Sequence, residues 1–281
     1  MAADQGFLKT FGVRLLAAMV MLPLFIFTAF WGGWWFFAFT AVAVFLVSRE
    51  FAQLALARGV KGVFPELILF QMIILLAFQM GGPGAGGELT GFLILMLLVW
   101  AALRGRIEGA WERVGTRVLA LFYLAWLPAH WILLRGLGEN MGFPAEAAGK
   151  WMLFGAGIIW LGDTGAYLVG SLFGRHSLGT PVSPNKSVEG VLGGLATSLA
   201  VAWFLREPWM PFLSGFQALG LGLVVALGGQ IGDLFESLLK RGAGSKDSGQ
   251  AIPGHGGFLD RLDSLLFGLP LLYYFLVWVI F

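Results

Sequence analysis

The sequence predicts an all-α fold: a polytopic membrane helix bundle of about nine transmembrane helices, with the N-terminus inside and the C-terminus outside. Of the 281 residues, 58% are hydrophobic and only 12% are charged, and the mean hydropathy is +0.82. A soluble fold of this size could not bury so much apolar surface, so lipid is the expected solvent. No long polar linker interrupts the chain, which predicts a single integral membrane domain over residues 1–281.

Apolar stretches long enough to cross ~30 Å of hydrocarbon as helices recur along the whole chain. They cover residues 11–30, 33–57, 65–80, 89–103, 115–135, 151–170, 188–205, 216–239 and 262–281. The first stretch is interpreted as a true span rather than a signal peptide, because no small-residue cleavage pattern precedes Trp31. The segment GGPGAGG, residues 81–87, is predicted to be an outer turn, since a phosphate-binding loop would need a following Lys-Ser or Lys-Thr and a preceding strand.

The distribution of positive charge predicts the orientation, because Lys and Arg are retained on the cytoplasmic side. With the N-terminus inside, fifteen of the 18 basic residues fall on the inner side, and only Arg135, Lys150 and Arg206 fall outside. The charge-rich segments 171–187 and 239–261 then face the cytoplasm, where nucleotides are available. These observations predict a bacterial-type inner membrane protein whose active site lies on the cytoplasmic face.

Two features of the composition exclude classes of function. The formal net charge of +2 is too small to indicate nucleic acid, so no nucleic-acid partner is expected. The absence of cysteine excludes disulfides, thiolate metal sites and a cysteine nucleophile.

Glycine, at 42 residues, is about twice as frequent as the average of ~7%, and small residues allow close helix packing in membranes. Because FQALGLGLVVALGGQIGD is especially rich in glycine, the eighth stretch is predicted to lie at the centre of the bundle.

Three polar residues follow one another along the end of that stretch. Asp233, Ser237 and Lys240 are spaced i, i+4, i+7, which puts them on one face of a helix. Asp233 is expected near the inner boundary of the hydrocarbon, where an ionised carboxylate needs a cation or a partner within the bundle. The alternative to a functional role is a structural one, in which Asp233 either snorkels at the helix end or pairs with Lys240.

The loop that follows combines carboxylates with cations and glycine. Asp260 and Asp263 are spaced i, i+3 where a helix is expected to begin, and carboxylates are the ligands that Mg²⁺ prefers, one or two per ion. The basic residues that can neutralise phosphate oxygens are Lys240, Arg241, Lys246 and Arg261. These are the components of a phosphoryl or nucleotidyl transfer site. The alternative is a solvated, positive loop on the inner side.

A second motif, SPNKSVEG, covers residues 183–190. Ser183 followed by Pro predicts a helix that begins at Ser183, whose free N–H groups would form an anion site together with Lys186. A simple capped helix start is the alternative. Asp163, well inside the sixth stretch, needs a partner, and Lys186 or a metal ion are the candidates.

Two further positions are open to more than one interpretation. Arg49 and Glu50, adjacent in the second stretch, either anchor its inner end or carry a function. His255, which lies between glycines, is expected to bond phosphate or to shape the loop. It is not expected to be a general base, because phosphate nucleophiles are already ionised.

The run from Ser237 to Asp263 resembles in full the signature of the phosphatidate cytidylyltransferases, also called CDP-diacylglycerol synthases. Its polar and glycine positions are Ser237, Lys240, Arg241, Lys246, Asp247, Gly249, His255, Gly256, Gly257, Asp260, Arg261 and Asp263. DTGAY, from Asp163, and SPNKSVEG resemble the two upstream motifs of that family, with Ser187 where Thr is frequent. The N-terminal half matches only in hydropathy.

The resemblance implies CTP and phosphatidate as substrates, CDP-diacylglycerol and pyrophosphate as products, dependence on Mg²⁺ with room for a second, monovalent ion such as K⁺, and a homodimer in contact with membrane lipids. Residues 1–148 would be a lipid-facing scaffold, and residues 149–281 would carry the catalytic motifs. The predicted catalytic residues are Asp233, Asp260, Lys240 and Asp263, with Asp233 and Asp260 holding the metal and Asp163 and Asp263 assisting. The predicted substrate-binding residues are Ser183, Asn185, Lys186, Ser187, Ser237, Arg241, Lys246, Asp247, His255, Gly256, Gly257 and Arg261.

Two other classes of protein share some of these features. A CTP-dependent polyprenol or lipid kinase would use the same nucleotide and metal but would transfer the γ-phosphate. A transporter would need its intramembrane acids to line a continuous path, and the clustering of cations at the inner face disfavours it.

Overall fold

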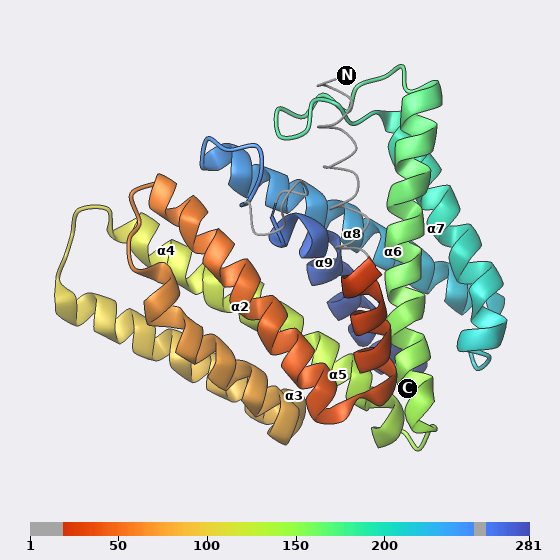
Figure 1. The fold of residues 1–281 in the computed structure, drawn as a ribbon, viewed down its shortest axis with the longest axis horizontal. Helices are drawn as coiled ribbons and strands as arrows, with labels where there is room; N and C mark the ends of the chain where they lie inside the picture. The colour runs from red at the N-terminus through yellow and green to blue at the C-terminus, as the bar shows by residue number, and fades with distance from the viewer. Residues whose placement is uncertain (1–18, 250–256) are drawn as a thin grey trace.

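The computed structural model describes residues 19–249 and 257–281 (Figure 1). Within these ranges the regular structure is helical, apart from one isolated antiparallel bridge between Ser177 and Ser187. The helices are a short helix Met19–Trp31, α2 (Gly33–Ala57), α3 (Val63–Arg104), α4 (Ala110–Leu121), the π-helix η1 (Phe122–Trp126), α5 (Leu127–Asn140), α6 (Ala145–Phe173), α7 (Val188–Trp209), α8 (Gly215–Gly242), α9 (Leu259–Phe275) and the π-helix η2 (Leu276–Ile280). The all-α prediction is confirmed.

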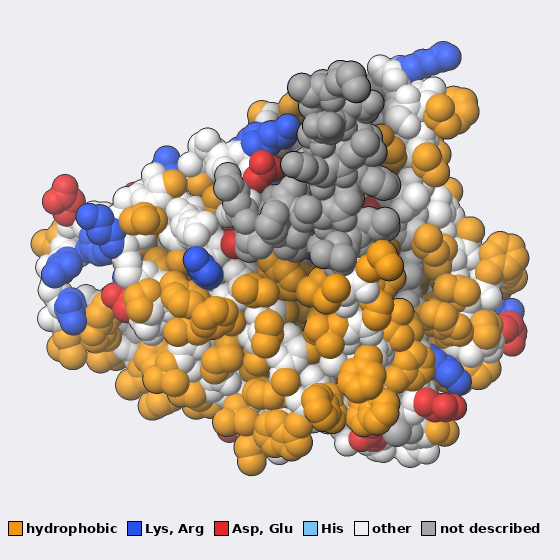
Figure 2. All heavy atoms as spheres, in the orientation of Figure 1, with side chains coloured by type: hydrophobic (Ala, Val, Ile, Leu, Met, Phe, Trp, Pro, Cys, Tyr) orange, Lys and Arg blue, Asp and Glu red, His pale blue; other side chains and the backbone are white. Residues whose placement is uncertain are grey.

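Seven helical stretches among the described residues are long and apolar enough to cross a bilayer: α2, α3, the continuous α4–η1–α5, α6, α7, α8, and α9 with η2. Large apolar side chains on them are exposed, as far as 92% at Trp111 of α4 and 90% at Phe216 of α8. In Figure 2 hydrophobic side chains cover a broad continuous area of the visible face, and charged side chains lie mostly toward its edges. Because water would oppose such a surface, the chain is an integral membrane protein.

Helix α3 combines the third and fourth predicted stretches and reverses direction inside its length. Gly82 has φ +67° and ψ −161°, a conformation that side chains other than glycine rarely adopt. A Cβ built on Gly86 would lie 2.4 Å from the ring of Phe78, and Glu66 and Arg104, from the two ends of α3, line one cavity. The two halves therefore lie side by side (Figure 1), and the glycine-rich turn is present as predicted.

The short helix Met19–Trp31 is the described part of the first predicted stretch, and Arg135 of α5 holds its end. The Arg135 guanidinium donates from Nε to the carbonyl of Ala29 at 2.5 Å and from a terminal nitrogen to the carbonyl of Phe30 at 2.9 Å. A Cβ on Gly32, whose φ is +65°, would lie 2.2 Å from this guanidinium. A buried arginine therefore binds carbonyls that a helix end leaves without intrahelical partners.

Helix α8 packs closely against α6, α7 and α9 through its glycines, but Leu223, Leu227, Ile231 and Leu238 are 41–53% exposed, so α8 is not fully enclosed as the prediction of a central position required. Gly222 faces Ala202 of α7, with only 2.6 Å between an added Cβ and the Ala202 Cβ. Gly229 faces Ile159 of α6 on one side and Ser264 of α9 on the other. Figure 1 shows α2, α3, α4 and α5 on one side of the α8–α9 pair and α6 and α7 on the other. The absence of side chains at these glycines lets three helices approach α8 closely.

Candidate active site

The C-terminal part of α8 and the first turn of α9 meet at a very close backbone approach. A Cβ on Gly232 would lie 2.4 Å from the backbone oxygen of Asp263, so only glycine fits there. The contact brings Asp233 and Lys240 of α8 to the same place as Asp260 and Asp263 of α9. The four residues predicted to be catalytic therefore lie together.

Lys240 bridges two carboxylates. Its Nζ lies 2.5 Å from Glu236 Oε2, one turn earlier in α8, and 2.5 Å from Asp260 Oδ1 of α9. Glu236 is fully buried, and neither of its oxygens makes a hydrogen bond of good geometry among the described residues, although the ammonium group is in contact. Lys240 thus supplies the compensating charge for a buried carboxylate, which would otherwise be costly at this depth.

Asp260 also organises the loop that leads into α9. Its Oδ2 accepts hydrogen bonds from Ser248 N at 3.2 Å, Ser248 Oγ at 2.9 Å and Gly257 N at 2.7 Å. One carboxylate therefore holds both ends of a loop whose middle, residues 250–256, lies outside the described residues. His255 and Gly256, both predicted to bind substrate, fall in that middle part.

Glu50 of α2 is a site residue that the sequence interpretation did not identify. It is only 2% exposed and accepts from Phe258 N at 2.8 Å, Leu259 N at 2.8 Å and Ser248 Oγ at 3.2 Å. These two N–H groups begin α9 and have no intrahelical acceptor, so the carboxylate acts as an N-terminal cap supplied by another helix. A Cβ on Gly257 would lie 2.6 Å from Glu50 Oε2, which requires glycine at this motif position.

Lys186 approaches the same region from the loop before α7. Its Nζ lies 2.6 Å from Asp233 Oδ2. Asp163 of α6 interacts electrostatically with both Lys186 and Asp233, and Asp263 does so with Asp233 and Lys240. The alternative interpretation of Asp233 as the partner of Lys240 is therefore wrong, and the two ion-paired groups form one site.

The prediction that a helix begins at Ser183 is also wrong. Helix α7 begins at Val188, and its N-cap is Ser187, whose Oγ accepts from Gly190 N at 3.1 Å. The bridge between Ser177 and Ser187 keeps the preceding residues in a loop, so the Ser-Pro pair does not start the helix. Lys186 consequently acts from a loop, and Ser187 provides the cap that was assigned to Ser183.

The remaining motif residues lie around this site. The exposed ones are Asn185, Arg241, Lys246, Asp247 and Arg261. Ser183 and Ser237 are half-buried, and Ser237 Oγ lies 3.5 Å from Asp233 Oδ1, as expected for residues on one helix face. Cations at the edge and carboxylates inside are the arrangement that a polyphosphate with its counter-ion requires.

Comparison with known proteins decides the family. Residues 12–279 match the model of the cytidylyltransferase family. The chain belongs to this family. A protein named "Phosphatidate cytidylyltransferase" from Synechocystis sp. is 35% identical over 289 residues, covering 94% of this chain and 96% of that protein. Proteins of the same name from Staphylococcus aureus and Staphylococcus epidermidis are 33% and 32% identical over 267 residues, covering 92% of this chain and 96% of each relative.

This cytidylyltransferase site contains more acids than lysines among the described residues. Its acidic side chains are Glu50, Asp163, Asp233, Glu236, Asp260 and Asp263, of which Asp163 is exposed, and its lysines are Lys186 and Lys240. If all are ionised, the carboxylates outnumber the two ammonium groups. In the described ranges no group of three or more His, Asp or Glu residues is arranged to hold a metal ion by itself. Mg²⁺ commonly binds one or two carboxylates and completes its shell with phosphate and water, so the residues fit an ion that arrives with a nucleotide.

Proposed function

We propose that this chain is a phosphatidate cytidylyltransferase, which converts CTP and phosphatidate to CDP-diacylglycerol and pyrophosphate in phospholipid biosynthesis. The observation that carries the proposal is the site at the α8–α9 contact. There, the Lys186–Asp233 pair and the Glu236–Lys240–Asp260 group stand together within the signature motifs. The names of the relatives support the same activity. The ion pairs of Lys186 and Lys240 bring the motifs together in one site.

In the proposed reaction a phosphate oxygen of phosphatidate attacks the α-phosphorus of CTP in line. The new bond joins that oxygen to the α-phosphorus, and the bond from the α-phosphorus to the bridging oxygen of the β-phosphate breaks. The bonding pair leaves with pyrophosphate. Because the attacking oxygen is already anionic, no general base is needed, and positioning and charge stabilisation provide the catalysis.

The residues of the chain would divide this work by their charge. Lys186 and Lys240 would hold substrate phosphates from the interior, and Arg241, Lys246 and Arg261 would do so from the edge. Ser183, Asn185 and Ser237 would donate hydrogen bonds to phosphate or ribose oxygens. Asp263, buried beside α8, would keep the local field negative so that a cation remains bound.

Mg²⁺ is the proposed cofactor, and Asp233 and Asp260 would hold it with help from Asp163 and Asp263. Bound with the nucleotide, it would neutralise charge that develops on pyrophosphate. We also propose a second, monovalent ion such as K⁺. It would be bound by the negative charge of those carboxylates that neither the lysines nor Mg²⁺ neutralise. Omission of Mg²⁺ and of K⁺ in turn, with the rate as the readout, tests both.

The connections between helices fall at two opposite ends of the bundle, which supports the proposed topology. Phe281 contacts Phe143 and Phe212, so the C-terminus, the α5–α6 connection and the α7–α8 connection share one end. Glu50 and Lys186 both reach the α8–α9 site at the other end. When the two halves of α3 are taken separately and the N-terminal apolar segment is included, this alternation corresponds to nine crossings.

Positive charge then orients the bundle with the N-terminus and the active site in the cytoplasm of a bacterial-type cell and the C-terminus outside. Because the chain has no cysteine, Ser245→Cys gives a single labelling site in the α8–α9 loop. A membrane-impermeant thiol reagent should label it only after the inner face is exposed. Labelling of intact cells from outside would contradict the orientation.

Phosphatidate would enter sideways between helices, because its acyl chains can stay in the bilayer throughout. We also propose a homodimer, on the family resemblance, which crosslinking in native membranes and the mass of the purified particle would test. Residues 1–148 would be mainly scaffold, with Glu50 as their contribution to the site.

The activity itself is tested with CTP labelled at the α-phosphorus, purified protein and phosphatidate. A cytidylyltransferase leaves the label on lipid and releases unlabelled pyrophosphate. A CTP-dependent lipid kinase transfers label only from γ-labelled CTP, and a transporter transfers label from neither. Label on lipid from γ-labelled CTP but not from α-labelled CTP would overturn the proposal.

A further inference from the structure

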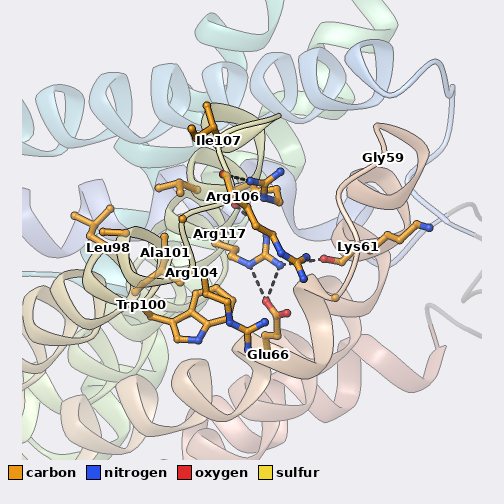
Figure 3. Close-up of a pocket in the computed structure, with 17 residues that line it drawn as sticks. Gly59, Lys61, Glu66, Leu98, Trp100, Ala101, Arg104, Arg106, Ile107 and Arg117 are labelled. Atoms are coloured by element: carbon orange, nitrogen blue, oxygen red, sulfur yellow. Dashed lines mark hydrogen bonds and ion pairs between the residues drawn. The ribbon is translucent and has the colours of Figure 1, made fainter.

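The cavity lined by Glu66 and Arg104, of about 700 Å³, lies in the N-terminal half, and none of the residues of the α8–α9 site lines it. Its walls are the segment before α3, the two ends of α3 and the start of α4 (Figure 3). Its charged lining residues are Lys61, Glu66, Arg104, Arg106, Arg113 and Arg117. Five cations and one anion give the lining a formal charge of +4, so the cavity is suited to an anion.

Arg117 makes this cavity a built site rather than a chance gathering of surface charges. It is only 5% exposed, and Nε donates to Glu66 Oε2 at 2.7 Å while the terminal nitrogens donate to the carbonyls of Arg113 at 3.1 Å and Lys61 at 3.0 Å. Arg113 in turn donates to the carbonyl of Arg106. These bonds fix the loops on both sides of the cavity before any ligand is present.

Two of the cations remain available to a ligand. Arg106 is exposed and forms no ion pair with an acid anywhere in residues 19–249 or 257–281. The guanidinium of Arg104 lies over the Trp100 ring, 4.8 Å from its centroid, which orients the group without neutralising it. Figure 3 shows Arg104, Arg106 and Arg117 around the cavity, whereas the side chain of Lys61, at the edge, extends away from them. Several cations around one space favour an anion with several oxygens, such as a phosphate.

The apolar part of the cavity indicates what carries the phosphate. Leu98 and Ile107 also line it and are 43% and 90% exposed. Nearby, Leu103 and Trp111 are 84% and 92% exposed at the ends of membrane-spanning helices. A free phosphate would leave these side chains in water, whereas a phospholipid covers them with its acyl chains. Basic pockets between transmembrane helices at a membrane surface are typical headgroup sites.

We propose that this cavity binds the phosphate headgroup of an anionic phospholipid, as a second lipid site distinct from the α8–α9 site. Helix α2 connects the two, since Glu50 contacts the α9 start and Gly59, just beyond the helix, lines the cavity. The inference does not depend on the proposed reaction, because no residue of the reaction site takes part in it.

The test uses the full chain in neutral detergent with Ile107→Cys as the only thiol, labelled with an environment-sensitive fluorophore. Phosphatidylglycerol is titrated as the anionic probe, with phosphatidylcholine of the same acyl chains and inorganic phosphate in parallel. In this background Arg104→Gln with Arg106→Gln removes two lining charges. Arg58→Gln is the matched control, because Arg58 is an exposed cation of the same connection that does not line the cavity.

Phosphatidylglycerol should bind more tightly than phosphatidylcholine. The double variant should bind phosphatidylglycerol about 30-fold more weakly than the unchanged chain. Each cation near an anionic headgroup contributes about 1 kcal/mol, so two contribute about 2 kcal/mol, and 1.4 kcal/mol is a factor of ten. Arg58→Gln should leave the affinity unchanged. Equal weakening by Arg58→Gln, or no weakening by the double variant, would overturn the proposal. If inorganic phosphate alone saturated the fluorescence change, the ligand would be a soluble anion and the lipid proposal would be wrong. Circular dichroism checks folding, and Arg106→Gln alone is the second variant if the double one does not fold.

Discussion

Replacement of Glu50 is expected to disable the active site although this side chain touches no proposed substrate or metal atom. Glu50 is 2% exposed and accepts two backbone hydrogen bonds at 2.8 Å and one from Ser248 Oγ at 3.2 Å. A hydrogen bond to a buried charged group contributes about 1.5–3 kcal/mol, and an unpaired buried N–H costs about 1–3 kcal/mol. Glu50→Gln keeps the volume but removes the charge and turns an amide NH₂ toward one of the N–H donors.

The loss of one such bond, together with weakening of the others, amounts to about 3 kcal/mol. This energy holds the first turn of α9, and with it Asp260, in position. Because 1.4 kcal/mol corresponds to a factor of ten, the equilibrium constant between the positioned and displaced states of Asp260 falls by about a hundredfold, and kcat falls by up to that factor. Glu50→Asp, one methylene shorter, cannot reach both N–H groups and should lie between Gln and the unchanged chain.

The assay measures initial rates with purified protein, varied CTP and saturating phosphatidate. We expect kcat to fall while the KM for CTP changes little, because the basic groups that bind phosphate are untouched. Glu146→Gln is the matched control: Glu146 is exposed, forms an i, i+4 pair with the partly exposed Lys150 at the opposite end of the bundle, and contributes at most about 0.5 kcal/mol. A folded Glu50→Gln protein with an unchanged kcat would refute the positioning role.

Three further predictions test the site. Asp233→Asn and Asp260→Asn should each abolish turnover at every Mg²⁺ concentration while insertion and helix content survive, which rate titrations and circular dichroism would check; near-normal rates in the double variant would show that both acids are structural. Lys186→Ala should raise the KM for CTP or phosphatidate without unfolding the chain, and unchanged kinetics at limiting concentrations of both substrates would argue against phosphate binding. Gly232→Ala should destabilise the protein by about 1–3 kcal/mol in thermal unfolding, because its Cβ would lie 2.4 Å from the backbone of α9, whereas Gly91→Ala, which faces open space, should not.

Hydropathy and glycine content were sufficient to predict the helical bundle, because both act locally along the chain. An apolar segment must have a minimum length to cross the bilayer as a helix, so hydropathy locates the helices. Glycines allow other helices to approach closely, as Gly222 and Gly229 do on α8. The number of spans is harder to predict from the sequence than the presence of helices. The sharp bend at Gly82 leaves hydrogen-bonded helix on both sides, so two predicted stretches form the single assigned helix α3.

The site was predictable where its residues share a helix or a short loop. Asp233 and Lys240, and likewise Asp260 and Asp263, could be placed by helix periodicity alone. Glu236 was not identified, although its i, i+4 spacing to Lys240 is a recognisable signal. Glu50 could not be assigned to the site from periodicity, because the bond from Leu259 N spans 209 positions in sequence. Its only signal was an acid inside an apolar stretch, which requires some partner without indicating which one.

The error at the start of α7 has a physical cause of the same kind. A Ser-Pro pair favours a helix N-terminus, but Ser187 offers an equally good cap four residues later. The bridge from Ser177 to Ser187 selects the later one, and local propensity contains no information about that bridge. The consequence is functional, because Lys186 remains in the loop and can extend to Asp233 on α8.

The ion pairs explain how a site rich in charge can exist at the boundary of a bilayer. The sequence assigned Asp233 and Asp260 to a metal ion and Lys186 and Lys240 to phosphates. In the structure these same groups are partners of one another, Lys186 with Asp233 and Lys240 with Asp260. Paired charges are far less costly than isolated ones where hydrocarbon replaces water. When a nucleotide brings its phosphates, they compete with the carboxylates for the two ammonium groups, and each carboxylate released is a free anionic ligand. Both assignments are therefore compatible with the pairs, because binding exchanges one set of ion pairs for another: the phosphates take the two ammonium groups, and a cation that arrives with the nucleotide takes the released carboxylates.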